Sequence, residues 1–217
     1  MFFRFLWTLV WLLLWLVVVL LGPATLLLFG GRLASDLMAT LGFGWLAFAC
    51  LSLLVVLEVV LQRVWFFPGS GVPVSEDELR GRLLAVNNQA VPVRVGERRR
   101  KLTVGWRYDE VPWCELFSRR NLSNLYELRL RLDPLTRTVT LMDRRRSVQF
   151  LFCPEGVKTG WPRVVLPFLW LRLGRLGSVE QYAVTEPYLY DFHPREIKAP
   201  VMGTILASGW DVRFSLF

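Results

Sequence analysis

The sequence predicts a membrane-anchored α+β protein. A two-helix transmembrane hairpin comes first. A cytoplasmic domain follows, with two to three short helices and an antiparallel β-meander that can close towards a barrel. Two long uncharged apolar stretches predict the hairpin, and apolar residues alternating with charged ones between turn signals predict the meander. We expect the two spans within residues 1–67, a linker at 68–74 and the soluble domain at 75–217.

The first span is expected over about residues 5–29. Residues 5–31 carry no charge, and a helix rising about 1.5 Å per residue crosses a hydrocarbon core of roughly 30 Å over this length. A secretory signal peptide is the competing interpretation, but its apolar region would be shorter and would end at a small-residue cleavage site. Here Gly22-Pro23 is followed by more leucine, which favours an uncleaved helix that kinks at Pro23.

The second span is expected over about residues 42–61. The connection to the first span is short, so the two must form a hairpin. Arg4 and Arg63 flank the outer ends, whereas the connection carries Arg32 offset by Asp36. The positive-inside rule then predicts a multi-pass protein of an inner or plasma membrane with both termini in the cytoplasm.

Glu58 is the one acidic residue within a predicted span. A carboxylate inside a membrane suggests a functional contact, such as a polar contact with a partner helix or an ion path. The alternative is structural, because Glu58 lies near the predicted cytoplasmic end and can reach interfacial water or Arg63.

The formal net charge of +8 is concentrated in the soluble domain. A basic domain held at a membrane meets anionic headgroups, each well-placed basic residue contributing about 1 kcal/mol. Nucleic acid is an unlikely partner, because no nucleic-acid motif is present and most basic residues are spread between apolar ones. A membrane-protein partner and a homo-oligomer both remain open.

The cysteines are Cys50, Cys114 and Cys153. Cys50 lies in a span, and the other two have neither paired spacing nor a nearby histidine. We therefore expect neither a disulfide framework nor a zinc site, which suits a reducing cytoplasm.

The glycines and serine of the linker predict flexibility. A helix then begins at Ser75, which forms a capping box with Glu78, and ends near Asn87-Asn88. Strands at 91–95 and 102–108 follow. The loop between these strands carries a basic run made of Arg98, Arg99, Arg100 and Lys101.

A second helix is expected after Asp109, and the clearest strand signal comes next. Tyr126 to Leu132 alternate apolar and charged residues, which predicts a strand with one buried face and one wet face. Return strands are expected at 138–142 and 148–153, separated by a basic turn that contains Arg144, Arg145 and Arg146. Each basic segment is either a solvated loop or a contact for anionic headgroups or a partner.

Residues 164–171 form a continuous apolar run between Arg163 and Arg172 that is too short to cross a bilayer. One interpretation is a buried strand with an edge or bulge at Pro167. The other is an interfacial segment that places Trp170 at headgroup level. Further on, we expect a strand at 179–184, a helix that reaches Ser208 and stops at Gly209, and a terminal strand at 211–217.

No catalytic, cofactor or metal site is expected. His193 is the one histidine, Pro194 follows it, and its setting is typical of a helix start. Asp109, Glu110 and Glu115 form an acidic cluster, but carboxylates at helix starts are common. An enzyme is thus possible but not favoured.

The preferred function is a membrane-tethered binding or scaffolding protein, an accessory subunit or regulator of a membrane assembly. Two alternatives are a ligand-sensing effector with a barrel-like domain and an enzyme that acts on lipid-linked substrates.

Overall fold

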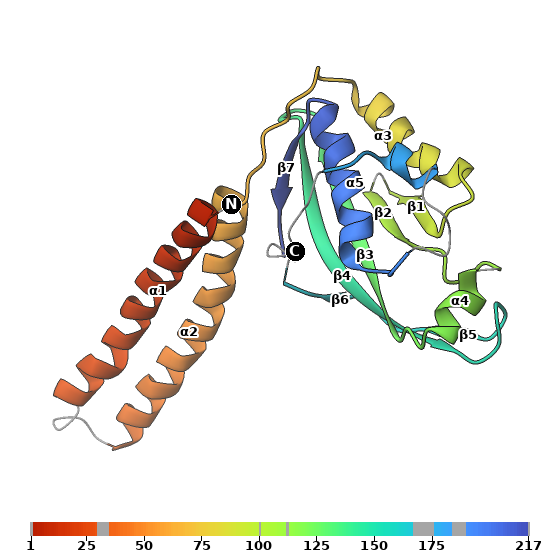
Figure 1. Cartoon of the computed structure of the whole chain (residues 1–217). Helices are drawn as coiled ribbons and strands as arrows, with labels where there is room; N and C mark the ends of the chain where they lie inside the picture. Colours follow the sequence, from red (N-terminus) through yellow and green to blue (C-terminus); the bar gives the residue numbers. More distant parts are fainter. Residues whose placement is uncertain are drawn as a thin grey trace. The chain divides into compact units, whose positions relative to one another are not determined.

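The computed structural model describes residues 2–29, 35–99, 101–111, 113–166, 176–183 and 190–216 (Figure 1). The chain divides into two compact units, residues 1–66 and residues 67–217. The first unit is helical and the second is an α+β domain built on a curled, mainly antiparallel sheet.

The first unit contains two long helices, α1 (Phe2–Phe29) and α2 (Ser35–Val64). Both extend beyond the predicted spans, and both are long and apolar enough to cross a membrane. Only 6% of the most apolar stretch of α1 and 17% of that of α2 are buried. A core helix of a soluble protein would bury most of such a surface. The two helices are therefore candidate membrane spans, and they suggest association with a membrane.

An indole nitrogen compensates for the proline in α1. Pro23 has no N–H, so the carbonyl oxygen of Val19 loses its usual helical donor. Trp45 of α2 supplies a replacement, because its Nε1 donates to the Val19 oxygen at 2.9 Å. Gly22 makes this approach possible, since any side chain there would collide with the Trp45 ring. The freed carbonyl thus finds another partner, as a proline in a membrane helix requires.

Replacing Trp45 with phenylalanine is expected to destabilise the helix pair. The ring is kept but the Val19 oxygen loses its donor, at a cost of about 0.6–1.7 kcal/mol in the range known for hydrogen bonds between membrane helices. Thermal unfolding of the detergent-solubilised protein measures the change. Trp7→Phe is the matched control, because Trp7 is 57% exposed. Equal midpoints for the two variants would contradict the assigned contact.

The second unit contains seven strands among its described residues. They are β1 (Val93–Arg98), β2 (Lys101–Trp106), β3 (Asn124–Asp133), β4 (Thr138–Phe150), β5 (Val157–Thr159), β6 (Arg163–Val164) and β7 (Asp211–Phe214). The sheet order is β1-β2-β3-β4-β5, and β6 and β7 also pair with β4. All pairs are antiparallel except β4 with β7, which run parallel because helix α5 carries the chain back before β7 begins.

Strand β4 corrects the predicted turn around Arg144, Arg145 and Arg146. The strand continues through these residues to Phe150, and the predicted strand at 148–153 is its end. A run of arginines lacks the apolar alternation of an ordinary strand. Here, however, the alternation holds in space, because Asp143 is buried on the packed face whereas Arg144 and Arg146 lie on the opposite face.

The helices of this unit are α3 (Glu76–Leu84), α4 (Trp113–Arg119) and α5 (Pro194–Ala207), with 3₁₀ turns at Ala85–Asn88 and Val179–Ala183. One of the two hydrogen bonds of the predicted capping box is confirmed, since Ser75 Oγ accepts from Glu78 N. The strand predicted at 179–184 is wrong: Val179 N donates to Thr204 Oγ1, so the segment packs on α5 and not in the sheet. Helices α3 and α5 lie on one face of the sheet (Figure 1).

Helix α5 is capped at both ends. His193 is the N-cap. Its Nδ1 accepts a hydrogen bond from Arg195 N, and Glu196 Oε2 accepts one from His193 N. At the other end Gly209 has φ of 70°, and Trp210 N donates back to Ile205 O. This C-terminal stop confirms the prediction for Gly209.

The segment predicted to be a flexible linker is bound to the domain. Phe67 bridges to Val212, Gly69 N donates to Asp211 Oδ1, and Val74 N donates to Ser208 O. Composition predicts flexibility here, but the end of α5 and the start of β7 offer carbonyl and carboxylate acceptors that hold the backbone.

The predicted absence of a disulfide is wrong. Cys114 of α4 and Cys153, just after β4, form a disulfide with Cα atoms 5.6 Å apart. They are 39 residues apart in sequence, so spacing alone could not reveal the pair. Disulfides persist in oxidising compartments, and these cysteines therefore no longer support a reducing cytoplasm.

Candidate functional site

One face of the sheet is rich in arginine. Strand register and the alternation of side chains place eight basic residues there, beside the carboxylates of Glu127, Asp133 and Asp211. The opposite face packs on α3 and α5 and holds apolar residues such as Leu128, Leu141 and Val212. We call the first of these faces the basic face, and its basic residues are Arg94, Arg98, Lys101, Arg129, Arg131, Arg144, Arg146 and Arg213.

Three cations form a row across the basic face. Arg98 lies opposite Lys101, and Lys101 lies opposite Arg131 on the next strand. Like charges directly opposite each other destabilise a sheet. None of the three forms an ion pair with another residue that the structure describes. Asp133 interacts electrostatically with Arg131, so the row has an acidic neighbour but keeps an excess of positive charge.

A second like-charge contact lies further along the face. Burial lowers the pKa of Arg144, and the neighbouring charge of Arg129 lowers it further. The Nε of Arg144 is buried and has no hydrogen-bond partner, although one terminal nitrogen is 3.5 Å from Leu216 O. Positive charges thus lie close together at two places on the basic face, the row of three cations and the pair of Arg129 and Arg144.

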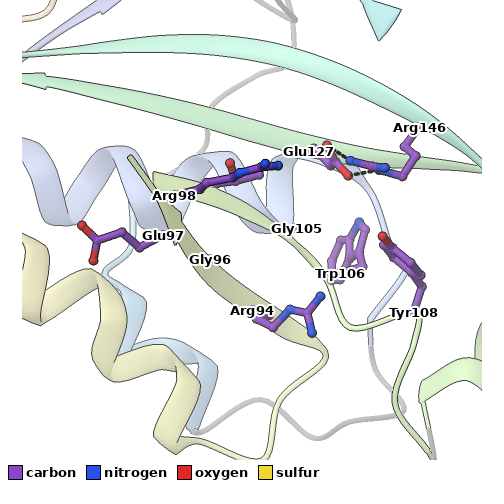
Figure 2. Close-up of a pocket in the computed structure, with 10 residues that line it drawn as sticks. Arg94, Gly96, Glu97, Arg98, Gly105, Trp106, Tyr108, Glu127 and Arg146 are labelled. Atoms are coloured by element: carbon purple, nitrogen blue, oxygen red, sulfur yellow. Dashed lines mark hydrogen bonds and ion pairs between the residues drawn. The ribbon is translucent and has the colours of Figure 1, made fainter. Parts of the chain in front are cut away.

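A hollow of about 230 Å³ lies on this face (Figure 2). Its floor is Gly96, Thr103 and Gly105 of β1 and β2, and arginines from β1 and β4 surround it. Figure 2 shows Arg98 and Arg146 extending along the sheet from opposite directions, with the Glu127 carboxylate between them.

The Glu127–Arg146 pair closes one side of the hollow. Arg146 Nε donates to Glu127 Oε1, and Arg146 Nη2 is 3.3 Å from Glu127 Oε2. This hydrogen bond raises the pKa of Arg146, and only 8% of the Glu127 side chain is exposed. Glu127 is therefore already occupied, and Arg146 is fixed in position by it.

Two aromatic residues complete the lining. Trp106 is 2% exposed, and its indole Nε1 has no hydrogen-bond partner within the described structure. Partial burial raises the pKa of Tyr108, so its hydroxyl keeps its proton and can donate. The hollow thus combines guanidinium groups with the neutral Tyr108 hydroxyl, whereas the Trp106 ring packs against Phe117 and Phe192.

A buried charge cluster lies on the other face of the sheet. Lys198 Nζ of α5 donates to Asp143 Oδ2 at 2.7 Å, and Tyr126 OH donates to Asp143 Oδ1 at 2.8 Å. The side chains of both Lys198 and Asp143 are 0% exposed. Burial lowers the pKa of Lys198 and raises that of Tyr126. The Lys198–Asp143 pair is enclosed in the core, where it joins α5 to β4.

The predicted contact residues are only partly brought together. Arg98, Lys101, Arg144 and Arg146 lie on the basic face, whereas Arg145 projects from the opposite side of β4. Arg99 lies in the β1–β2 turn with φ of 50°. Arg100, Trp170 and most of the apolar run at 164–171 lie outside the described residues. Glu58 accepts a hydrogen bond from Gln62 Nε2 at 2.6 Å.

The candidate acids and the histidine have structural partners. Arg94 contacts Asp109 and Glu110 at 3.2 and 3.4 Å, and Glu115 pairs with Arg119. No group of acids, cysteines and histidine that could hold a metal ion occurs among the described residues. Sequence reasoning missed Arg94, Arg129, Arg131 and Arg213. The alternation of β3 had already placed Arg129 and Arg131 on its wet face.

Comparison of this chain with protein-family models, with curated protein sequences and with solved structures finds no match.

Proposed function

We propose that this is a membrane-tethered binding or scaffolding protein, an accessory subunit or regulator of a membrane assembly, whose basic face binds anionic headgroups. The row of Arg98, Lys101 and Arg131 carries the proposal, because these adjacent cations form no ion pair with another described residue and the nearby Asp133 leaves them with an excess of positive charge. Two candidate membrane spans precede this domain in the same chain.

The strength of such binding follows from simple electrostatics. Each basic residue near an anionic surface contributes about 1 kcal/mol, so a row of three contributes about 3 kcal/mol, or roughly a hundredfold in affinity. Salt screens this attraction over about 10 Å at 0.1 M ionic strength. Salt sensitivity is therefore part of the proposed function.

Two signals bear on which side of the membrane the domain occupies. The flanking arginines Arg4 and Arg63 favour the cytoplasm, but that bias depends on few charges. The Cys114–Cys153 disulfide favours an oxidising compartment. Because a disulfide requires an oxidising compartment, we propose that the domain and both termini face the oxidising side, against phosphate-bearing headgroups of that leaflet.

Full-length protein in nanodiscs of neutral phosphatidylcholine is expected to bind vesicles that contain phosphatidylglycerol, and to bind phosphatidylcholine vesicles much more weakly. Substituting Arg98, Lys101 and Arg131 with glutamine together should weaken binding about a hundredfold. Vesicle flotation at low and high salt provides the measurement.

The matched control removes the same charge elsewhere. Arg137, Lys158 and Arg195 are exposed and lie outside the basic face, and their triple glutamine variant should keep most of the binding. Equal binding to neutral vesicles, or equal losses in the two triple variants, would overturn the proposal, because position on the face would then be irrelevant.

A further inference from the structure

We propose that the hollow on the basic face is a binding site for a phosphate monoester group. This inference builds on the proposed function, since phosphatidic acid carries such a group as its headgroup, but it concerns one defined site and not the whole charged surface. The same group also occurs in soluble phosphomonoesters, and the test below separates these two sources.

Gly96 and Gly105 form part of the floor of the hollow, and the backbone conformation requires glycine at neither position. A Cβ at Gly96 would come no nearer than 3.8 Å to Thr103 O, and one at Gly105 would lie 3.5 Å from Glu127 Cγ. Both are ordinary contacts, and neither glycine has a positive φ. Glycine within a strand weakens the strand and often marks a place where a ligand approaches the backbone. We therefore attribute the two glycines to the open space above them, which a ligand can occupy.

The surrounding side chains suit a compact oxyanion. Arg98 has no ion pair with any residue that the structure describes, and Arg94 has two loose ones, at 3.2 and 3.4 Å, to carboxylates that are about two-fifths exposed. Both guanidinium groups can therefore turn to a ligand at little cost. Guanidinium binds phosphate through paired N–H donors, which gives both charge and geometry.

Tyr108 adds a neutral donor to this lining. Its hydroxyl keeps its proton, because partial burial raises its pKa, and it can donate to a ligand oxygen. Trp106 also borders the hollow, and Figure 2 shows it beside Tyr108, but its ring packs against Phe117 and Phe192. A neutral apolar ligand would leave the arginines without a counter-charge.

The size of the hollow limits the ligand. Its volume of about 230 Å³ is below the roughly 300–1,000 Å³ of pockets for drug-sized ligands. A phosphate with a small attached alcohol fits this volume, but an acyl chain does not. A lipid would therefore insert its headgroup alone, and a soluble glycerol phosphate would bind in the same way.

Isothermal titration of glycerol phosphate into full-length protein in phosphatidylcholine nanodiscs tests the site, with glycerol as the uncharged control. We expect saturable binding of glycerol phosphate alone. Arg98→Gln should weaken it about tenfold or more, as expected for loss of a charge-assisted contact, and Arg98→Lys should restore only part of it. Gly96→Val with Gly105→Val should abolish binding, because the valines fill the hollow without removing charge. The Arg137, Lys158 and Arg195 triple variant should bind normally.

The outcomes separate this proposal from the proposed function. Binding of anionic vesicles without binding of glycerol phosphate overturns the phosphate site and leaves the surface function standing. Binding of glycerol phosphate without binding of vesicles that contain either phosphatidylglycerol or phosphatidic acid supports the site and overturns the headgroup function, since the source is then a soluble phosphomonoester. Unchanged binding in the double valine variant, with its fold verified by circular dichroism, overturns the site whatever the vesicles do.

Discussion

Replacing Asp143 with alanine is expected to destabilise the domain by about 3–5 kcal/mol. The substitution leaves the ammonium of Lys198 buried without a counter-charge and removes the acceptor of the Tyr126 hydroxyl. For a domain of this size each kcal/mol lowers the unfolding midpoint by about 2–4 °C. Thermal unfolding of the full-length protein, followed by near-ultraviolet circular dichroism, should therefore show a fall of roughly 6–20 °C.

Two further variants test whether the unpaired charge of Lys198 causes this loss of stability. Asp143→Leu combined with Lys198→Met removes both charges, and it should recover most of the lost stability because no unpaired charge remains. Lys158→Met removes an exposed lysine and should change the midpoint little. If the double variant were as unstable as Asp143→Ala, packing and not charge would explain the loss.

Reduction of the Cys114–Cys153 disulfide is expected to produce the second large effect. The 39-residue separation corresponds to about 4 kcal/mol of chain entropy in the unfolded state, and measured values for such bonds fall mostly at about 2–4 kcal/mol. The Cys114→Ser, Cys153→Ser variant should therefore unfold at a markedly lower temperature than the parent protein. It should also be insensitive to reductant, whereas the parent protein should lose stability when reductant is added.

Thiol counting supplies the control. The protein purified without reductant and then denatured should expose one reactive thiol, that of Cys50, and reduction should raise the count to three. Cys50→Ser should leave the unfolding midpoint nearly unchanged, since Cys50 is exposed and unpaired. Three reactive thiols before reduction would contradict both the disulfide in the native protein and the proposed placement of the domain in an oxidising compartment.

Locally determined features are the ones that the sequence predicted well. The start of α3 depends on Ser75 and Glu78 three residues on, and the stop of α5 depends on Gly209 alone. Strand β3 was predictable because each face of it is chemically uniform. In these places the deciding interactions lie within a few residues of one another, so a single sequence contains enough information.

The remaining features depend on distant partners. Asp143 can lie inside a strand only because Lys198 meets it from 55 positions further along the chain. The disulfide joins residues that no spacing rule connects. The basic face arises from register, which brings Arg98, Lys101 and Arg131 into line although they belong to three strands. Sequence reasoning found the basic runs but could not show which of their members share a surface.

The buried Lys198–Asp143 pair also discriminates between alternative alignments of β4. Because side chains alternate, a slip of one position would turn every inward residue of β4 outwards. Asp143 would then face water, Arg144 would enter the apolar core, and Lys198 would meet a guanidinium instead of a carboxylate. Each consequence is unfavourable, so the misaligned sheet is excluded by charge as well as by packing. The alignment that buries this pair is also the one that presents Arg129, Arg144 and Arg146 together on the opposite face.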